Sequence, residues 1–267
     1  MKQEREVSVE GTVYRVVISD EQETLLAARV AGRVPVGLLH EEGEQDLGAA
    51  HFLVETLETV DERYLERVVR RELGLPWVIG ESERLILREF AMGDLEQVVR
   101  EPEDGDGDRV FYTPDRLEAY IRGQYGFYEY GLWAVVRKAD GRLMGKAGIT
   151  GCHVRDGNMP GEPEEWMELG YHIFTPYRRQ GYAEEACRII LDYAEQEYGC
   201  PVCAYVETGN AASAALLEKL GFQKMTEKIP ESCAKLKVHG SILRESESTE
   251  QRCTESDVPQ YRYVRNC

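Results

Sequence analysis

Short apolar runs rich in β-branched residues alternate with amphipathic stretches through the first part of the chain. The runs predict strands over residues 13–19, 34–39 and 51–55, and the helical spacing predicts helices over 21–31 and 61–73. The second helix should end at Leu73, because Gly74 can adopt a left-handed cap and Pro76 cannot continue a helix. This β-α-β-β-α order is that of half a Rossmann-type sheet, and we expect a small α/β accessory domain over residues 1–79.

A second pattern begins after Gly80 and fills the rest of the chain. Its predicted strands cover residues 84–90, 132–137, 143–150, 166–174, 203–207, 222–228 and 261–265. Its predicted helices cover residues 94–100, 114 to about 125, 182–198 and 211–220. Strand hairpins followed by β-α-β-α units predict a mixed central sheet with helices on its faces, in a domain over residues 80–267. The stretch 230–259, rich in Ser, Glu and Thr, is long for a hairpin loop and should be either mobile or a lid.

The composition, with 42% hydrophobic and 30% charged residues, is typical of a folded globular protein. The formal net charge of −17 disfavours nucleic acid as a partner, because that contact depends on Lys and Arg displacing counterions from phosphates. An acidic surface could attract amines, but many cytosolic proteins are acidic for solubility alone, which is the preferred interpretation. No apolar run approaches the roughly 18 residues that span a bilayer. We therefore expect no membrane contact and a cytoplasmic location.

The cysteines and acidic runs do not indicate a metal site. The seven cysteines are odd in number and lack framework spacing, which favours reduced thiols. Cys200 and Cys203 form a Cys-x-x-Cys pair, but no second pair follows at ligand spacing. The stretch 104–108, DGDGD, resembles the start of a calcium loop but continues with Arg109 where that loop needs glycine. His153 also lacks partners at ligand spacing, and we expect no metal.

The predicted helix over residues 182–198 carries apolar residues on one face and must pack on the sheet. The chain enters it through Arg178-x-x-Gly181-x-Ala183, in which glycine permits close approach of the backbone. Free N–H groups and the positive end of the helix dipole would attract an anion, and a pyrophosphate would fit against residues 179–184. An ordinary glycine-containing turn between a strand and a helix is the structural alternative.

Two segments carry a resemblance to a known family. Residues 173–183, IFTPYRRQGYA, resemble the acyl-CoA-binding motif of GNAT acetyltransferases, whose pattern Arg/Gln-x-x-Gly-x-Gly/Ala they meet. Residues 210–222, NAASAALLEKLGF, resemble the C-terminal motif of the RimJ/RimL-like branch of that family. The resemblance covers about residues 82–229, with both motifs at predicted junctions of strand and helix.

The resemblance implies a GNAT fold and acetyl-CoA as co-substrate. It implies direct acetyl transfer to a primary amine, either of a small molecule or of a protein N-terminus, and a homodimer is a further expectation at the level of the family. In the family, main-chain N–H groups beside a splayed strand polarise the thioester carbonyl, which here implies Ile173 and Phe174. The full set of implied cofactor-binding residues is Ile173, Phe174, Arg178, Arg179, Gln180, Gly181, Tyr182, Ala183 and Asn210.

Asn210 and Ser213 stand at the start of the predicted helix over residues 211–220. Asparagine is a favoured N-cap, so Asn210 should bind the amide of Ala212 or Ser213. The resemblance adds a contact between Asn210 and the pantetheine arm. Ser213, on the same helix face, is implied to lie near the CoA sulfur and to protonate the departing thiolate. The alternative for Ser213 is a local hydrogen bond within the helix, and many family members use tyrosine for this step.

An attacking amine must be neutral, and a carboxylate can assist its deprotonation directly or through water. Glu168 is the first candidate for this base. Strand alternation predicts Glu168 and His172 on one face of the sheet, with Leu169 and Tyr171 on the other. The alternative without a catalytic role is that Glu168 is a solvated strand carboxylate and His172 a structural histidine. A second interpretation of the whole chain is a catalytically inactive CoA-binding regulatory or scaffold protein.

The N-terminal segment carries a weaker resemblance. Residues 20–39, DEQETLLAARVAGRVPVGLL, resemble the part of haloacid-dehalogenase-type phosphatases in which an acidic residue ends a strand and an alanine-rich helix follows. Those enzymes need an Asp-x-Asp pair on an earlier strand, and nothing upstream of Val13 supplies one. We therefore expect a degenerate accessory domain, with packing, substrate gating or simple structural padding as its role.

Overall fold

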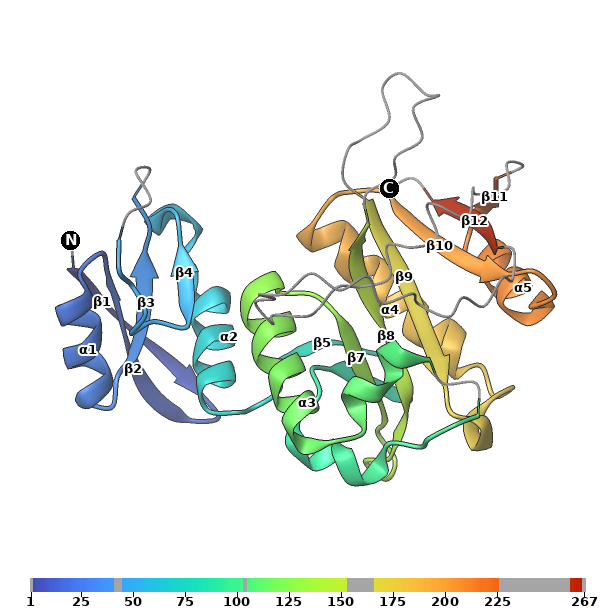
Figure 1. Cartoon of the computed structure of the whole chain (residues 1–267), viewed down its shortest axis with the longest axis horizontal. Coiled ribbons are helices and arrows are strands. Elements are labelled where there is room, and N and C mark those ends of the chain that lie inside the picture. The colour runs from blue at the N-terminus through green and yellow to red at the C-terminus, as the bar shows by residue number, and fades with distance from the viewer. Residues whose placement is uncertain (1, 41–44, 103–104, 153–165, 226–259, 266–267) are drawn as a thin grey trace, which may run out of the picture. The chain divides into compact units, whose positions relative to one another are not determined.

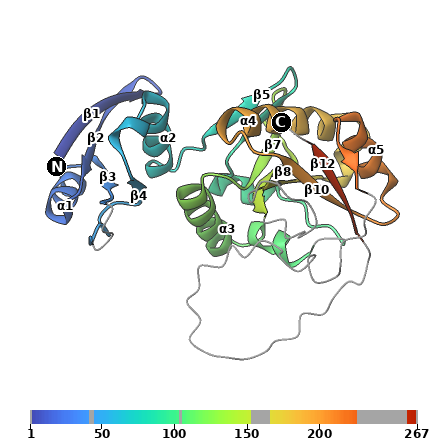
Figure 2. The same cartoon turned by 90° about the horizontal axis from the view of Figure 1, so that it is seen from above.

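The structure is a computed structural model that describes residues 2–40, 45–102, 105–152, 166–225 and 260–265, and it divides into two compact units, Met1–Trp77 and Val78–Cys267. Figures 1 and 2 show the chain from two directions. Several expectations fall outside the described residues: His153, Asp104, the stretch 230–259 and the end of the strand predicted over 222–228.

The first unit contains a four-stranded sheet in the order β1-β2-β3-β4. Its strands are β1 (Lys2–Val9), β2 (Thr12–Ser19), β3 (Val34–Leu38) and β4 (Phe52–Val54). β2, β3 and β4 are parallel, as a half-Rossmann sheet requires, whereas β1 forms an antiparallel hairpin with β2. The sequence analysis missed β1, because most residues of this edge strand are polar. β1 buries only Val7 and Val9.

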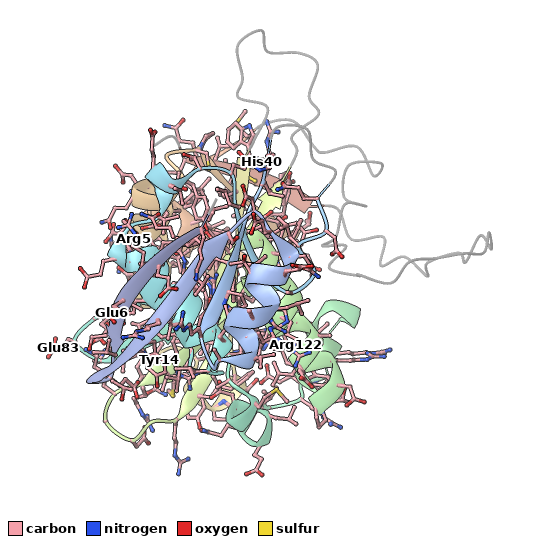
Figure 3. The ribbon with its side chains drawn as sticks, turned by 90° about the vertical axis from the view of Figure 1, so that its left-hand side faces the viewer. Arg5, Glu6, Tyr14, His40, Glu83 and Arg122 are labelled. Carbon is pink, nitrogen blue, oxygen red and sulfur yellow. The ribbon has the colours of Figure 1, made fainter. Side chains whose placement is uncertain are left out.

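Two helices cover this sheet, α1 (Gln22–Val30) and α2 (Glu62–Glu72), with the short η1 (Leu57–Thr59) before α2. Leu65, Val68 and Val69 of α2 pack with alternate residues of the strands, and Leu25 of α1 belongs to a separate cluster. Gly74 has a φ of +70° and the Leu75 N–H donates to the Arg70 carbonyl, which confirms the predicted helix end. Figure 3 looks onto this unit, with Arg5, Glu6 and Tyr14 labelled on its first hairpin.

The second unit is built on an eight-stranded sheet in the order β11-β12-β10-β9-β8-β7-β6-β5. The strands are β5 (Val78–Glu81), β6 (Leu85–Arg88), β7 (Leu132–Arg137), β8 (Leu143–Cys152), β9 (Trp166–Ile173), β10 (Val202–Glu207), β11 (Gln223–Lys224) and β12 (Gln260–Arg265). The pair β9–β10 is parallel and the other neighbours are antiparallel. The expected mixed sheet is confirmed.

The helical elements of this unit form two layers. They are η2 (Met92–Gln97), η3 (Asp106–Phe111), α3 (Pro114–Tyr120), η4 (Ile121–Tyr128), η5 (Thr175–Tyr177), α4 (Tyr182–Glu197) and α5 (Ala211–Lys219). α4 and α5 lie on one side of the sheet and α3 on the other (Figure 2). On the α3 side, buried Lys146 of β8 pairs with Asp108 of η3 at 2.6 Å.

Three predicted elements before β7 differ from the structure. The strand predicted over residues 84–90 is preceded by a hairpin partner, and the Ser82 hydroxyl caps the turn by accepting from the Leu85 N–H at 3.0 Å. The helix predicted over 94–100 is a 3-10 helix. The helix predicted from Pro114 becomes a π-helix at Ile121, which brings residues five apart onto one face. Tyr120 and Tyr125 both bind the main chain of Leu132 in this way.

Candidate active site

The parallel strands β9 and β10 separate in the middle of the sheet. Their register pairs Met167 with Val202 and Glu168 with Cys203, and the two described strands share no further pair. The Met167 N–H donates to the Pro201 carbonyl at 3.1 Å on that side. β9 nevertheless continues to Ile173, so one edge of β9 is open over residues 169–173.

Main-chain donors along the open edge follow from the alternation of a strand. The register between β9 and β8 is uninterrupted, and the Phe174 N–H donates to the Met144 carbonyl on the β8 side at 2.9 Å. Because successive N–H groups point to opposite edges, the N–H groups of Leu169, Tyr171 and Ile173 face the opening. Of the two implied thioester donors, Ile173 therefore faces the opening, whereas the Phe174 N–H is already bound within the sheet.

The loop after β9 presents a helix N-terminus with free amide groups. Gly181 is the N-cap of α4 with a φ of +84°, and Arg179 also has a positive φ, of +60°. The first hydrogen bond of the helix runs from the Glu185 N–H to the Gly181 carbonyl at 3.1 Å. Glycine offers no capping side chain, so the amides of Tyr182, Ala183 and Glu184 remain as the donors that a helix start directs outward. This arrangement suits an anion such as a pyrophosphate.

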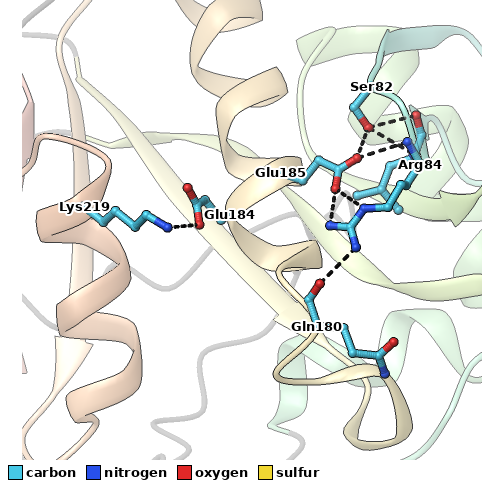
Figure 4. Close-up of polar contacts among 7 residues, drawn as sticks. Ser82, Arg84, Gln180, Glu184, Glu185 and Lys219 are labelled. Carbon is cyan, nitrogen blue, oxygen red and sulfur yellow. Dashed lines mark hydrogen bonds and ion pairs between the residues drawn. The ribbon is translucent and has the colours of Figure 1, made fainter.

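A network around Arg84 supports the loop from outside (Figure 4). Its guanidinium donates to Glu185 Oε2 at 2.7 Å and to the Gln180 carbonyl at 3.0 Å, and it lies 4.6 Å from the centre of the Tyr182 ring. Ser82 also binds Glu185. Burial opposes ionisation of Glu185, but the bonds from Ser82 and Arg84 outweigh it and lower the pKa of the carboxyl. Arg84 thus neutralises a carboxylate that would otherwise repel an anion at this helix start.

Glu184, the second acidic residue of the first turn of α4, is neutralised in the same way. Lys219 of α5 contacts its Oε2 at 2.6 Å, and Arg188 contacts its Oε1 at 3.1 Å. Figure 4 shows the pair with Lys219 bridging the two helices. The bond from Lys219 makes the largest contribution to lowering the pKa of Glu184, and the bond from Arg188 lowers it further.

Arg178, the first residue of the motif, points away from the helix start. Its Nε donates to the Ile173 carbonyl at 2.7 Å and its Nη2 to Glu101 Oε2 at 2.7 Å. The Glu101 side chain is 3% exposed, and it also accepts the Thr175 N–H at 2.6 Å and binds His172 Nε2. Burial opposes ionisation of Glu101, but the bonds from Thr175 and His172 outweigh it and lower its pKa. The sequence analysis missed Glu101, because no local pattern marks it.

The two residues at the start of α5 lie beside β9. Asn210 Oδ1 accepts the Ser213 N–H at 3.1 Å, which confirms the expected N-cap. The amide N–H donors of Asn210 are not used in this cap. The Tyr171 hydroxyl donates to the Ser213 main-chain oxygen at 3.4 Å, so Tyr171 and Ser213 meet on the helix side of β9. Burial raises the pKa of Tyr171 to about 12 and keeps its hydroxyl neutral.

Glu168 lies on the opposite side, where the strands separate. The predicted alternation is confirmed, since Tyr171 contacts α5 while His172 contacts Glu101 on the α3 side. Glu168 is opposite Cys203 on β10. A hydrogen bond with Cys152, burial and the Glu168 carboxylate raise the pKa of the Cys203 thiol. A thiol in this state stays protonated near neutral pH, whereas a carboxylate can accept a proton.

The structure thus brings Ile173, the 178–183 loop, Asn210 and Ser213 to the open edge of β9, with Glu168 at the point of separation. The His172 ring binds Glu101. Among the described residues, no group of three or more His, Cys, Asp or Glu side chains could hold a metal ion. No helix in the described part of the chain is both long enough and apolar enough to cross a membrane.

This fold and site agree with a comparison to protein families. The family described as "Acetyltransferase (GNAT) domain" matches residues 84–223, which is more than half of the chain. The protein therefore belongs to the GNAT acetyltransferase family. The matched region lies within the second unit.

Among individual relatives, the chain is similar to the uncharacterized N-acetyltransferase YoaA of Bacillus subtilis (strain 168), with 28% identity over 156 residues that cover 55% of this chain and 83% of YoaA. It is 33% identical to the uncharacterized protein YkkB of the same organism over 96 residues, which cover 35% of this chain and 51% of YkkB. The match thus spans about half the length of YkkB.

Solved structures are similar at a lower level. An acetyltransferase (GNAT family) from Bacillus anthracis has a TM-score of 0.45 and 19% identity, over 70% of this chain and 96% of that one. A ribosomal-protein-S5-alanine acetyltransferase from Vibrio fischeri has a TM-score of 0.48 and 16% identity, over 72% and 96% of the two chains. The comparisons do not support the haloacid-dehalogenase resemblance of the first unit. The strand before β2 in this unit is β1, which pairs antiparallel with β2. The sequence of β1, KQEREVSV, contains no aspartate and so does not supply the Asp-x-Asp pair that those phosphatases need.

Proposed function

We propose that this protein transfers an acetyl group from acetyl-CoA directly to a primary amine. The observation that carries the proposal is the open edge of β9 beside the uncapped N-terminus of α4. One end of this site offers amide donors to a pyrophosphate, and the other offers a main-chain N–H to a thioester carbonyl.

The residues present fit acyl-CoA. The amides of Tyr182, Ala183 and Glu184 would bind the pyrophosphate, while Arg179 and Gln180 line the same turn. The Ile173 N–H would bind the thioester carbonyl, and the Asn210 amide would donate to the pantetheine arm. Arg178 would act through the loop conformation, because its guanidinium binds Glu101 and Ile173.

Glu168 would act as the base for the attacking amine. An alkylamine is protonated at neutral pH, so Glu168 would accept one proton, directly or through a water, and free the nitrogen lone pair. The nitrogen then forms a bond to the carbonyl carbon while the Ile173 N–H stabilises the charge on oxygen. The C–S bond breaks, and Ser213 would give its hydroxyl proton to the departing thiolate. Solvent takes the second proton from the nitrogen, which leaves the neutral amide, and it also restores the proton of Ser213 and removes that of Glu168.

The acceptor is a primary amine of a small molecule or of a protein N-terminus. The motif over residues 210–222 resembles that of the RimJ/RimL-like branch, which implies either kind of acceptor. The net charge of −17 is compatible with cationic amines of either kind.

The test is to incubate the protein with acetyl-CoA and a panel of amines while recording free thiol. The panel should contain polyamines, amino sugars and peptides with free N-termini. Acetylation should release thiol with at least one amine, and Glu168→Gln should slow the release about 10²- to 10⁴-fold. Glu207→Gln, an exposed glutamate on β10, serves as the matched control and should leave the rate unchanged. If acetyl-CoA binds but no amine raises thiol release, the CoA-binding regulatory or scaffold interpretation takes the place of the enzyme.

A further inference from the structure

The carboxylate of Glu101 binds three residues of the stretch 172–178, at the end of β9. Oε1 accepts the Thr175 N–H at 2.6 Å, and Oε2 accepts Arg178 Nη2 at 2.7 Å and binds His172 Nε2. Arg178 and Glu101 are 77 positions apart in the chain. The side chain of Glu101 is 3% exposed, so this carboxylate depends on its protein partners.

These contacts fix the backbone on both sides of Ile173. His172 precedes Ile173 and binds Glu101 through its ring. Arg178 binds Glu101 with Nη2 and the Ile173 carbonyl with Nε at 2.7 Å. Thr175 begins η5, and its N–H is the first donor of that turn. A shift of the loop relative to Glu101 would therefore remove these donors from a buried carboxylate, which is strongly unfavourable.

We propose that Glu101 is a positioning residue of the acyl-CoA site, which holds the Ile173 main chain and the 175–181 loop in the conformation that receives the acyl-CoA. The inference rests on the function proposed above. Glu101 acts through Thr175 and Arg178 and does not itself contact the thioester. It also explains how the Arg178 guanidinium is held at the end of β9, since Nη2 binds Glu101 and Nε binds the Ile173 carbonyl.

The first test measures the dissociation constant of acetyl-CoA by calorimetry for the wild type and Glu101→Gln. The glutamine keeps the shape, but when its oxygen accepts the Thr175 N–H, an NH2 group replaces Oε2 and accepts from neither Arg178 nor His172. The dissociation constant should rise about 10- to 100-fold, the range for loss of a hydrogen bond to a charged group. The KM for acetyl-CoA should rise in step, with a smaller change in the KM for the amine.

The matched control is Asp94→Asn. Asp94 has a side chain that is 4% exposed and forms two bonds of 2.7 Å to Arg88 in the same unit, and these bonds involve no residue of the 175–181 loop. Both variants should lower the unfolding temperature, because each removes a buried charged partner. Asp94→Asn should nevertheless bind acetyl-CoA like the wild type, which separates positioning from general stability.

The outcomes distinguish the two proposals. If the wild type binds no acetyl-CoA, the proposed function fails. If the wild type binds and Glu101→Gln binds within twofold of it, the positioning role is overturned while the function stands. Should Glu101→Gln not fold, Arg178→Gln tests the same contact from its other side and should raise the dissociation constant equally. Where Glu101→Gln does fold, a double variant with Arg178→Gln should bind no worse than either single variant, and fully additive effects would also overturn the proposal.

Discussion

Replacing Gly181 with alanine should weaken acetyl-CoA binding by straining the loop at the start of α4. Gly181 has a φ of +84°, a region in which an L-residue costs about 1–2 kcal/mol. The added methyl group would also lie 3.3 Å from Arg84 Nη2. The same guanidinium supports the loop, because its Nη1 donates to the Gln180 carbonyl. The loop of the free variant should relax away from its present conformation.

The rise in the dissociation constant follows from the free energy needed to return the relaxed loop to its strained binding conformation. If the free loop relaxes fully, only a fraction of molecules has the binding conformation, and the dissociation constant rises by the inverse of that fraction. A cost of about 1–2 kcal/mol corresponds to about a 5- to 30-fold rise. Any part of the strain that the loop does not relax appears as a lower unfolding temperature, at about 2–4 °C for each kcal/mol in a unit of this size.

The chain offers a matched control at the other end of the same helix. Gly199 has a φ of +60°, and a methyl group there would meet no atom within 4 Å. Gly199→Ala should therefore lower the unfolding temperature without changing the dissociation constant of acetyl-CoA, measured by calorimetry. The assignment of this loop as the pyrophosphate site would be refuted if Gly181→Ala bound acetyl-CoA as tightly as Gly199→Ala.

Further outcomes test the individual roles. Glu168→Gln should reduce kcat about 10²- to 10⁴-fold with an unchanged KM for acetyl-CoA, and an undiminished kcat would remove Glu168 as the base. Ser213→Ala should lower kcat with acetyl-CoA but much less with an acetyl thioester of a more acidic thiol, whose thiolate needs no proton donor. Asn210→Ala should lower the unfolding free energy by about 1 kcal/mol, whereas Asn210→Asp should retain the cap in a denaturant titration. The lowered pKa of Glu101 means that its stabilising effect is present above the ordinary carboxyl value of 4.5 and is lost as pH falls towards the folded value. The difference in unfolding temperature between the wild type and Glu101→Gln should therefore shrink on acidification below that value, and a constant difference would contradict the assignment.

Features that depend on neighbours in the chain were predictable. The Asn210 cap, the end of α2 at Gly74 and the start of α4 at Gly181 each follow from residues within one turn of one another. The opposite directions of Tyr171 and His172 follow from the alternation of a strand, which holds wherever the register is uninterrupted. In contrast, the edge strand β1 has too few apolar residues to give a signal, because an edge strand buries only one side of itself.

The sequence by itself determined the family and predicted a helix start suited to an anion and acetyl-CoA as the acyl donor, because these features depend on short contiguous motifs with their own backbone requirements. The tertiary structure decided how that motif is used. It brought the exposed Arg178 side chain to Glu101, bound the Phe174 N–H to β8 and left one edge of β9 open from residue 169 onward. Each of these outcomes depends on groups far apart in the chain that meet only when the sheet is assembled. The role of a buried carboxylate such as Glu101 depends on the hydrogen-bond donors around it, and the fold fixes the positions of those donors.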